Sequence, residues 1–267
     1  RELKDDWDRG VLSLLTSSSW SSSSSSLPAR PARVRVERKR GSVKQSGTKA
    51  FLHSLAHAEG CAVDCFVDLV ARFLGEIQEL DSPEAFVSDA LRVAAEEATH
   101  FERLAGRLPA YGVAYGDLES HDALSSSMED TNDDLLARLV VVHLVQEARG
   151  LDVFPLGRAR LERAGDVEAV KILDLNYADE IRHVQVMLKW FKVFCELKGN
   201  DPKQKFADVV RDRARWKLQA LKPPFNHDAR IAAGFDDDWY LPLATTATGV
   251  TAAATSSSTE EETGEKK

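Results

Sequence analysis

Cysteine is scarce in this sequence, and long uninterrupted apolar runs are missing. The 267 residues contain three cysteines, Cys61, Cys65 and Cys195. An odd, small number in a chain of this size excludes a disulfide-dense scaffold and favours free thiols in a reducing compartment. No stretch of about 18 apolar residues is free of charges, which excludes a membrane-spanning helix. We therefore expect an intracellular, cytoplasmic protein. The first residue is Arg1 rather than Met, so we expect the true N-terminus to be missing or processed, and organelle targeting stays open.

Basic residues are outnumbered, with 35 Lys and Arg against 43 Asp and Glu and a formal net charge of −8. This balance excludes a generic nucleic-acid-binding protein and favours solubility. The exception is the basic linker, residues 27–48, whose cationic residues are Arg30, Arg33, Arg35, Arg38, Lys39, Arg40 and Lys44. RNA or another anionic surface is one partner that this linker could contact. The alternative is that it wraps over an acidic bundle, and the lack of interleaved aromatic residues favours this second interpretation.

Both ends of the sequence have too few apolar residues to build a core. Residues 1–26, rich in serine, are predicted to be a disordered leader with at most a short helix near residues 7–15, and residues 244–267 a disordered tail. The domain is predicted to span residues 49–243, and an apolar content of 43% is enough for a sizeable core. Its last part, residues 225–243, is rich in aromatic side chains and is expected to pack back on the rest.

Apolar residues recur at three- and four-residue steps, the period of helices that bury one face. These stripes predict long helices over residues 48–75, 83–108, 131 to beyond Glu147, and 166–197. Ser82 is expected to cap the second helix, Gly199 to follow the fourth, and Gly150 to bend the third. Residues 109–131 are predicted to form a long loop, either a substrate wall or a polar crossover, and residues 201–221 a shorter extra helix. The predicted fold class is all-α.

Two glutamate–histidine pairs lie on the inner stripes of the second and fourth predicted helices. Their Glu-x-x-His spacing places a carboxylate and an imidazole one turn apart on one face. The first and third helices each add one glutamate to their stripe. In chain order the six residues are Glu59, Glu97, His100, Glu147, Glu180 and His183. Charged groups on a buried face need partners, and this combination is the ligand set of ferritin-like di-metal four-helix bundles.

Four glutamates and two histidines supply what two neighbouring divalent cations need. Bridging carboxylates offset the repulsion between the cations, and neutral imidazoles leave coordination sites open. A mixture of carboxylate and imidazole ligands suits two iron ions, with manganese possible. We predict that Glu97 and Glu180 are the bridging ligands.

Residues beside the ligands are predicted to support them. Asp179 can accept a hydrogen bond from the outer ring N–H of a bound histidine, and Arg182 can hold Asp179. His143 and Tyr177 lie close to ligands in the sequence and are either supports of the same kind or ordinary core residues. Glu96 is expected to point about 100° away from the ligand stripe, outward or toward a neighbouring helix, so its replacement should leave metal bound.

Several spaced motifs resemble those of a known family. The stretches are LPARPARV, FLHSLAHAEGCAVD, EEATHFERL, AYGDLESHDAL, VQEARGLDV and DEIRHVQVMLKWF. Over residues 27–239 the sequence resembles the ferritin-like family called domain of unknown function 455, and the leader and the tail are expected to fall outside it. The motif DEIRH is also similar to that of bacterial multicomponent di-iron monooxygenases, and a more distant similarity is to the ferritin-like hydroxylase of a modified adenosine in tRNA. The resemblance implies a di-metal carboxylate bundle with the six ligands given above.

The sequence therefore predicts a ferritin-like di-iron protein that activates dioxygen to oxidise or hydroxylate an organic substrate. A small organic substrate and an electron donor are its expected partners, with Tyr111, Tyr115 and His121 as the expected wall of the substrate side. Two alternatives remain: a ferroxidase or other iron-handling protein, and a metal-free bundle whose buried Glu and His side chains pair with one another. The sequence does not specify the substrate or the oligomeric state.

Overall fold

The computed structural model describes residues 2–9, 36–37, 47–121, 123–213 and 221–244. Nearly all of the described chain outside loops is helical, which confirms the all-α class. Most of the serine-rich leader, most of the basic linker and the predicted tail lie outside the described residues. Within the leader, however, residues Glu2–Asp8 form helix α1, and the indole of Trp7 donates a hydrogen bond of 2.6 Å to the Ser88 hydroxyl. The one short helix that the prediction allowed in the leader, near residues 7–15, thus lies at Glu2–Asp8.

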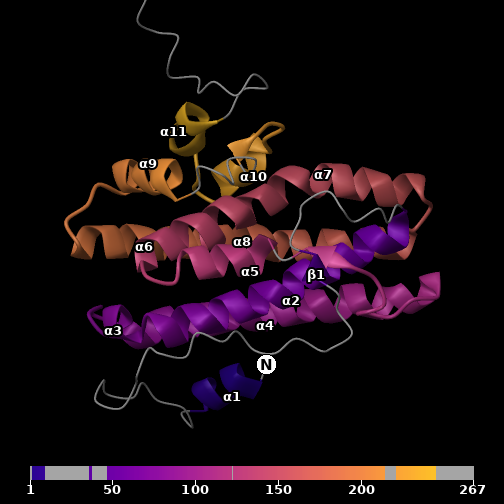
Figure 1. Ribbon diagram of the computed structural model, residues 1–267, viewed down its shortest axis with the longest axis horizontal. Helices are drawn as coiled ribbons and strands as arrows, with labels where there is room; N and C mark the ends of the chain where they lie inside the picture. The colour runs from indigo at the N-terminus through magenta and orange to yellow at the C-terminus, as the bar shows by residue number, and fades with distance from the viewer. Residues whose placement is uncertain (1, 10–35, 38–46, 122, 214–220, 245–267) are drawn as a thin grey trace, which may run out of the picture.

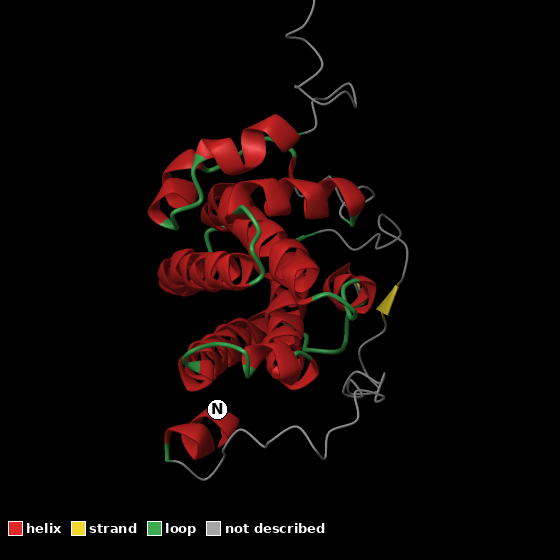
Figure 2. Cartoon of the chain, turned by 90° about the vertical axis from the view of Figure 1, so that its left-hand side faces the viewer, coloured by secondary structure: helices red, strands yellow, loops and turns green. Residues whose placement is uncertain are grey.

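Two pairs of long helices form the body of the molecule. Helix α2 (Thr48–Arg72) packs along α4 (Pro83–Arg107), and α7 (Glu147–Arg163) packs along α8 (Val167–Leu197). Figures 1 and 2 show the two pairs as stacked layers. Helix α4 of one layer contacts α8 of the other. Pro83 occupies the first turn of α4 as predicted, but the Ser82 side chain makes no capping hydrogen bond, contrary to expectation. A short helix, α3 (Leu74–Ile77), continues from the end of α2.

The third long helical stretch is irregular just before its glutamate. Helix α6 (Leu135–Arg138) begins after Asp134, whose side chain accepts from the backbone N–H of Ala137 at 3.0 Å. It continues into η2 (Leu139–Gln146), a π-helical stretch, and then into α7. Helix α7 runs through Gly150 without a break. The irregularity instead precedes Glu147, and π-helical turns are frequent at functional sites.

The stretch predicted as a long loop contains regular structure. It holds a 3₁₀ turn η1 (Leu108–Tyr111), a strand β2 (Ser120–His121) and helix α5 (Ala123–Asp130). Strand β2 pairs in parallel with β1 (Val36–Glu37), which brings part of the basic linker against this segment. The pairing places Val36 opposite Ser120 and Glu37 opposite His121.

The C-terminal segment packs on the α7–α8 pair. It contains α9 (Pro202–Asp212), α10 (His227–Ala232), α11 (Asp237–Tyr240) and a 3₁₀ turn η4 (Leu241–Leu243). The rings of Phe206, Phe235 and Trp239 are buried and pack against one another in edge-on or tilted orientations. The distances between their ring centroids are in the range expected of aromatic pairs. The extra helix predicted over residues 201–221 is α9, which ends at Asp212, and residues 214–220 lie outside the described residues.

The described core holds three apolar clusters, and two of them flank the predicted ligands. A large cluster includes Phe66 of α2, Ala94 of α4 and Val184 of α8, and a small cluster includes Ala56 of α2, Leu104 of α4 and Leu173 of α8. On each of these three helices the predicted ligands lie in sequence between members of the two clusters. The polar side chains are therefore held in a layer with apolar packing on both sides, where an unpartnered charge is costly.

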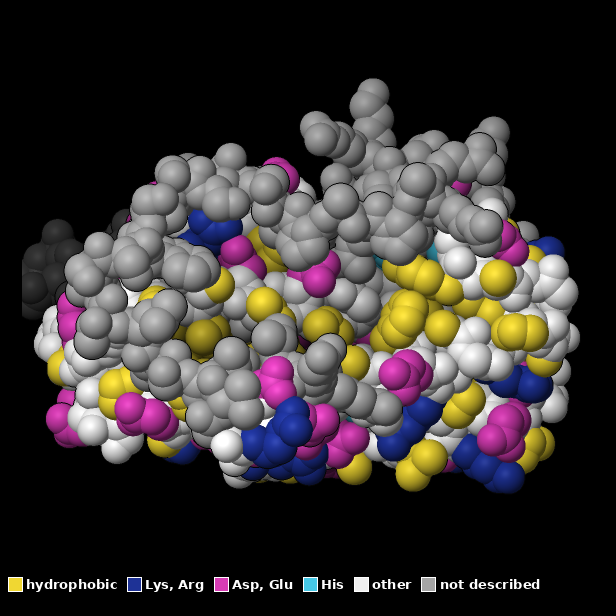
Figure 3. Space-filling view, turned by 90° about the horizontal axis from the view of Figure 1, so that it is seen from below, with side chains coloured by type: hydrophobic (Ala, Val, Ile, Leu, Met, Phe, Trp, Pro, Cys, Tyr) yellow, Lys and Arg dark blue, Asp and Glu magenta, His cyan; other side chains and the backbone are white. Residues whose placement is uncertain are grey.

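The outer surface of the described chain carries charges of both signs. On the face seen in Figure 3, acidic and basic side chains are interspersed with apolar ones. Among the described residues, no helix combines the length and the apolar character needed to cross a membrane.

Candidate metal centre

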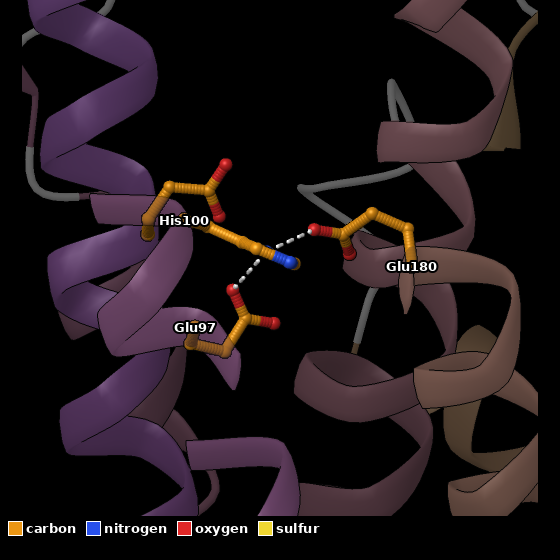
Figure 4. Close-up of side chains that lie close together, drawn as sticks. Glu97, His100 and Glu180 are labelled. Atoms are coloured by element: carbon orange, nitrogen blue, oxygen red, sulfur yellow. Dashed lines mark ion pairs between the residues drawn. The ribbon is translucent and has the colours of Figure 1, made fainter. Parts of the chain in front are cut away.

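Three predicted ligands meet where α4 faces α8. Helix α4 presents Glu97 and His100 one turn apart, and α8 presents Glu180 from across the layer boundary (Figure 4). The His100 Nδ1 atom lies 3.3 Å from Glu97 Oε2 and 3.0 Å from Glu180 Oε1. His100 and Glu97 are buried, so these contacts are shielded from solvent.

The second histidine repeats this arrangement on the other helix. The His183 Nδ1 atom lies 2.9 Å from Glu97 Oε1 and 3.6 Å from Glu180 Oε2. Each of the two carboxylates therefore has one oxygen beside each imidazole. The ring centroids of His100 and His183 are 5.6 Å apart. Two carboxylates that each span two imidazoles have the arrangement of ligands that bridge a pair of cations.

The inward atoms of this group are close together but are not aligned for hydrogen bonding. Both Glu97 oxygens and the Nδ1 atoms of His100 and His183 are buried and make no hydrogen bond within the described chain. Short distances without donor–acceptor alignment mean that these atoms point into a shared space rather than at one another. This convergence fits cation ligands better than a hydrogen-bonded network, because a network would satisfy each buried polar atom.

The two single glutamates complete the wall of this space. One ligand atom from each of Glu59, Glu97, His100 and Glu180 lies within 4.8 Å of the others, close enough to surround a single ion. Glu147, at the start of α7, is outside this set of four, but it lines one cavity together with Glu59 and Glu180, and burial with the charges of Glu97 and Glu180 raises its pKa. His183 joins the group through its contacts with Glu97 and Glu180, so the two imidazoles share these two carboxylates.

The charges of this group are poorly balanced by side chains alone. Burial, together with the charges of Glu97 and Glu180, raises the pKa of both Glu59 and Glu147 well above the usual range. Burial also acts on Glu97, but His183 and His100 outweigh it and hold the pKa of Glu97 below its ordinary value. Two imidazoles therefore stabilise part of the carboxylate charge, and the remaining acids stay protonated unless a cation replaces the protons.

A pH prediction follows from these shifts. Burial disfavours a charged His100, yet its contacts with Glu180 and Glu97 raise its pKa to about 10. Stability from this imidazolium is present below its usual pKa of 6.5 and is lost as pH rises through about 10. The raised acids Glu59 and Glu147 act in the same direction, because the unfolded chain ionises them first. We expect the melting temperature of chelator-treated protein to fall by several degrees from about pH 6 to about pH 9.

Metal should reverse this trend. Binding requires neutral imidazoles and ionised carboxylates, so metal affinity rises with pH as protons are released. Thermal unfolding of chelator-treated and metal-loaded protein across this pH range measures both slopes. A melting temperature of the metal-free protein that rises steadily with pH would contradict these pKa assignments.

The outer nitrogens of the two histidines are held by acids from the opposite helices. His100 Nε2 of α4 lies 3.1 Å from Asp179 Oδ2 of α8, and His183 Nε2 of α8 lies 2.9 Å from Glu96 Oε2 of α4. The Arg182 Nη2 atom lies 2.8 Å from both Glu96 Oε1 and Asp179 Oδ1. Donation from Nε2–H leaves each Nδ1 lone pair free to bind a cation.

Of these two histidine–acid contacts, the sequence predicted only the one made by Asp179. Sequence reasoning proposed that Asp179 holds a histidine and that Arg182 holds Asp179, but it did not assign Glu96 to His183. The shared pattern, in which an acid precedes the ligand glutamate on both α4 and α8, was the available signal. Because Glu96 contacts the outer nitrogen of a predicted ligand, we expect its replacement to weaken metal binding rather than to leave it unchanged.

Replacement of Arg182 tests this outer arrangement. Arg182→Ala removes a side chain that contacts both Glu96 and Asp179, so the acids that hold the two imidazoles are themselves no longer held in place. We expect metal affinity to fall by about 10- to 100-fold, the usual cost of losing such support. A competition titration with a chelator measures it. Arg158→Ala, which disrupts ion pairs with Asp174 and Glu162 on the exposed side of α7, is the matched control and should bind metal normally.

His143 and Tyr177 occupy different environments. His143 is fully buried in η2 against Phe66, and burial, reinforced by the charge of Arg138, lowers its pKa to about 3. Neither ring nitrogen has a hydrogen-bond partner within the described chain, so a supporting role for His143 stays a prediction. The Tyr177 hydroxyl accepts from Asn226 Nδ2 at 2.7 Å, and its ring stacks on Phe154 with centroids 3.7 Å apart.

A cavity of about 760 Å³ lies between α2, α7 and α8. It opens onto the six predicted metal ligands (the ligand group). Glu59, Glu147 and Glu180 form part of its lining, which is otherwise largely apolar. His121 also lines this cavity, as expected. Tyr111 and Tyr115 do not line it: the Tyr111 hydroxyl bonds to Asp166, and the Tyr115 hydroxyl lies 3.0 Å from His57 Nδ1. The volume is in the range of sites for small organic ligands.

Comparison with known proteins gives a family without an assigned activity. The model of the family described as "Protein of unknown function (DUF455)" matches residues 1–241, so the match includes the serine-rich leader that was expected to fall outside it. A protein of Haemophilus influenzae named "Uncharacterized protein" is 37% identical over 205 residues, which is 75% of this chain and 70% of that protein. No solved structure matches the chain.

Proposed function

This chain belongs to the DUF455 family, and we propose that it is a ferritin-like protein that holds two iron ions and uses dioxygen to oxidise or hydroxylate an organic substrate. One observation carries the proposal. Glu97 and Glu180 each place one oxygen beside His100 and the other beside His183. With Glu59 and Glu147 as further ligands, the set fits two cations that share two carboxylates.

The donor atoms favour iron among the available metals. Carboxylates and imidazoles without thiolates suit iron or manganese, whereas structural zinc sites are rich in cysteine. The described cysteines support this choice, because Cys61, Cys65 and Cys195 are buried and burial raises the pKa of the Cys65 and Cys195 thiols. Manganese remains the alternative occupant.

The residues of this chain have separate roles in the proposed reaction. When bound, the irons supply the redox chemistry, in which one atom of O2 enters a substrate C–H bond and the other leaves as water, with electrons and protons from an external donor. Asp179 and Glu96 hold the imidazoles in the tautomer that presents Nδ1 inward. The apolar cavity beside Glu59, Glu147 and Glu180 holds the substrate next to the ligand group and limits the access of water.

The cavity also argues against an iron store as the main function. A path for hydrated Fe²⁺ needs acidic or polar side chains along its length. Within the described lining, the acids are the three predicted ligands Glu59, Glu147 and Glu180, and the rest of the wall is mostly apolar or cationic. The metal-free alternative is disfavoured because it leaves the buried inward atoms of Glu97, His100 and His183 without hydrogen bonds within the described chain.

Oxidation of iron-loaded protein separates these functions. The protein is loaded with Fe²⁺ without oxygen, desalted and exposed to O2 while the optical spectrum and O2 consumption are recorded. We expect a new visible or near-ultraviolet absorption and O2 uptake that stops unless a reductant is added. Continued uptake on repeated Fe²⁺ additions, with many irons retained per chain, would favour the ferroxidase. A protein that binds no iron and shows no spectral change would contradict the proposal.

A further inference from the structure

The charges that line the cavity are unevenly distributed. Its acidic residues belong to the ligand group, and its basic residues are Arg149, Arg160 and Arg163 of α7. Once two divalent cations balance the ligand carboxylates, the described lining is left with a positive charge. An anionic group is therefore the charge that this cavity can accept most readily.

Two of these arginines lack a carboxylate partner in the described chain. Arg149 donates to the carbonyls of Lys222 and Pro224 and lies 3.6 Å from Asp152, so it is already engaged. Arg160 donates to the carbonyl of Gly47 at 2.9 Å, and Arg163 to that of Ala159 at 3.2 Å. A guanidinium has five N–H donors, so both retain donors for another acceptor.

This lack of ion pairing is unusual in a chain with a net charge of −8. The other arginine on the same stretch of α7, Arg158, forms ion pairs with both Asp174 and Glu162. Arg160 is also held over the Phe51 ring with its guanidinium carbon 4.8 Å from the centroid. A half-buried, pre-positioned guanidinium is suited to bind a carboxylate or phosphate.

The positive end of the cavity lies far from the metal ligands. Arg160 follows Glu147 by thirteen positions along α7, which corresponds to about 20 Å at a rise of about 1.5 Å per residue. The wall between them includes Val153, Phe154 and Gly157 of α7 and Leu55 of α2. At Gly157 an added Cβ would lie 2.9 Å from the Phe51 ring, so glycine permits the close packing that forms this part of the wall.

We propose that the cavity binds a long, single-chain organic anion whose acidic group contacts Arg160 and Arg163 and whose apolar chain extends along α7 toward Glu147. As an assignment of the substrate class, this rests on the proposed oxidase function; as a binding site, it rests on the cavity alone. The distance between the arginines and the ligand group predicts reaction at a carbon far from the acidic end. The apolar wall contributes affinity through burial of the chain, and the arginines set its direction.

Binding of hexadecanoate to iron-loaded protein tests the proposal. Calorimetric titration should give about one hexadecanoate per chain, with much weaker binding of octanoate and of the cationic hexadecyltrimethylammonium. Replacement of both arginines, Arg160→Gln with Arg163→Gln, should weaken hexadecanoate binding by about tenfold or more and leave binding of uncharged hexadecanol almost unchanged. Val153→Phe should weaken both by filling the cavity, and Arg158→Gln is the matched control.

Each outcome bears on a separate claim when iron is measured in the same samples. Equal binding of hexadecanoate, hexadecanol and the cation, or no effect of the arginine replacements, would overturn the anion assignment. Iron-loaded protein that binds none of the long-chain probes would overturn the cavity proposal and leave the metal centre standing. Hexadecanoate binding by protein that takes up no iron would overturn the oxidase function and retain the cavity assignment.

Discussion

Replacement of Glu97 by alanine is expected to abolish almost all metal binding. Glu97 is fully buried, and its two oxygens face His100 and His183 separately. Without it, two cations lose a shared negative ligand and repel each other through a space that water does not screen well. Iron content after loading and desalting should fall below about a tenth of the native value.

Two further variants separate ligand loss from unfolding. Glu97→Gln has nearly the same shape and should also lose metal, while its circular dichroism stays native. Glu102→Ala removes an exposed acid from the same helix and should bind iron normally. Native iron content in Glu97→Ala, or loss of iron in Glu102→Ala, would mean that the inner face of α4 does not carry the ligands.

The second large effect concerns the anchor of the C-terminal segment. Arg230 of α10 donates to Asp152 of α7 through Nε at 2.8 Å and Nη2 at 2.7 Å, and both side chains are fully buried. Tyr240 covers the guanidinium, with its ring centroid 4.2 Å from the guanidinium carbon. Arg230→Met leaves Asp152 buried without its main partner, so we expect a loss of about 3 to 5 kcal/mol of unfolding free energy.

A double replacement tests the cause of this loss. Asp152→Leu combined with Arg230→Met removes both charges and should recover much of the lost stability in urea unfolding. Lys203→Ala, which removes exposed ion pairs with Asp236 and Asp238, should leave stability almost unchanged, because solvent screens such pairs. No recovery in the double variant would show that packing against Tyr240, rather than the uncompensated charge, dominates. Because Asn226 connects this segment to Tyr177, the single variant should also loosen the cavity wall.

The convergence of Glu97, His100, Glu180 and His183 could be predicted from the sequence because helical geometry links spacing to direction. A carboxylate and an imidazole three residues apart must share a face, and apolar neighbours show that the face is inward. The same reasoning gave the start of α4 at Pro83 and predicted Asp179 as a histidine partner. Residue spacing therefore predicted most of the polar side chains that face the interior of the bundle.

Relations between helices were not accessible in the same way. Glu96 was placed away from the ligand stripe of its own helix, which is correct, but only the packing of α4 on α8 brings it to His183. The π-helical stretch before Glu147 follows no simple sequence signal, and the bend was expected at Gly150 instead. The cavity, and the lack of a carboxylate partner for Arg160 within the described residues, depend on how α2, α7 and α8 pack together, which periodicity within one helix does not reveal.

The central claim is that two metal ions share Glu97 and Glu180. Diffraction from crystals of iron-loaded protein, with anomalous differences recorded at the iron edge, tests it most directly. We predict two peaks about 3.5 to 4 Å apart, one beside His100 and one beside His183, with both glutamates between them. A single peak, peaks bound elsewhere, or no peak in crystals grown with excess iron would contradict a shared di-metal centre.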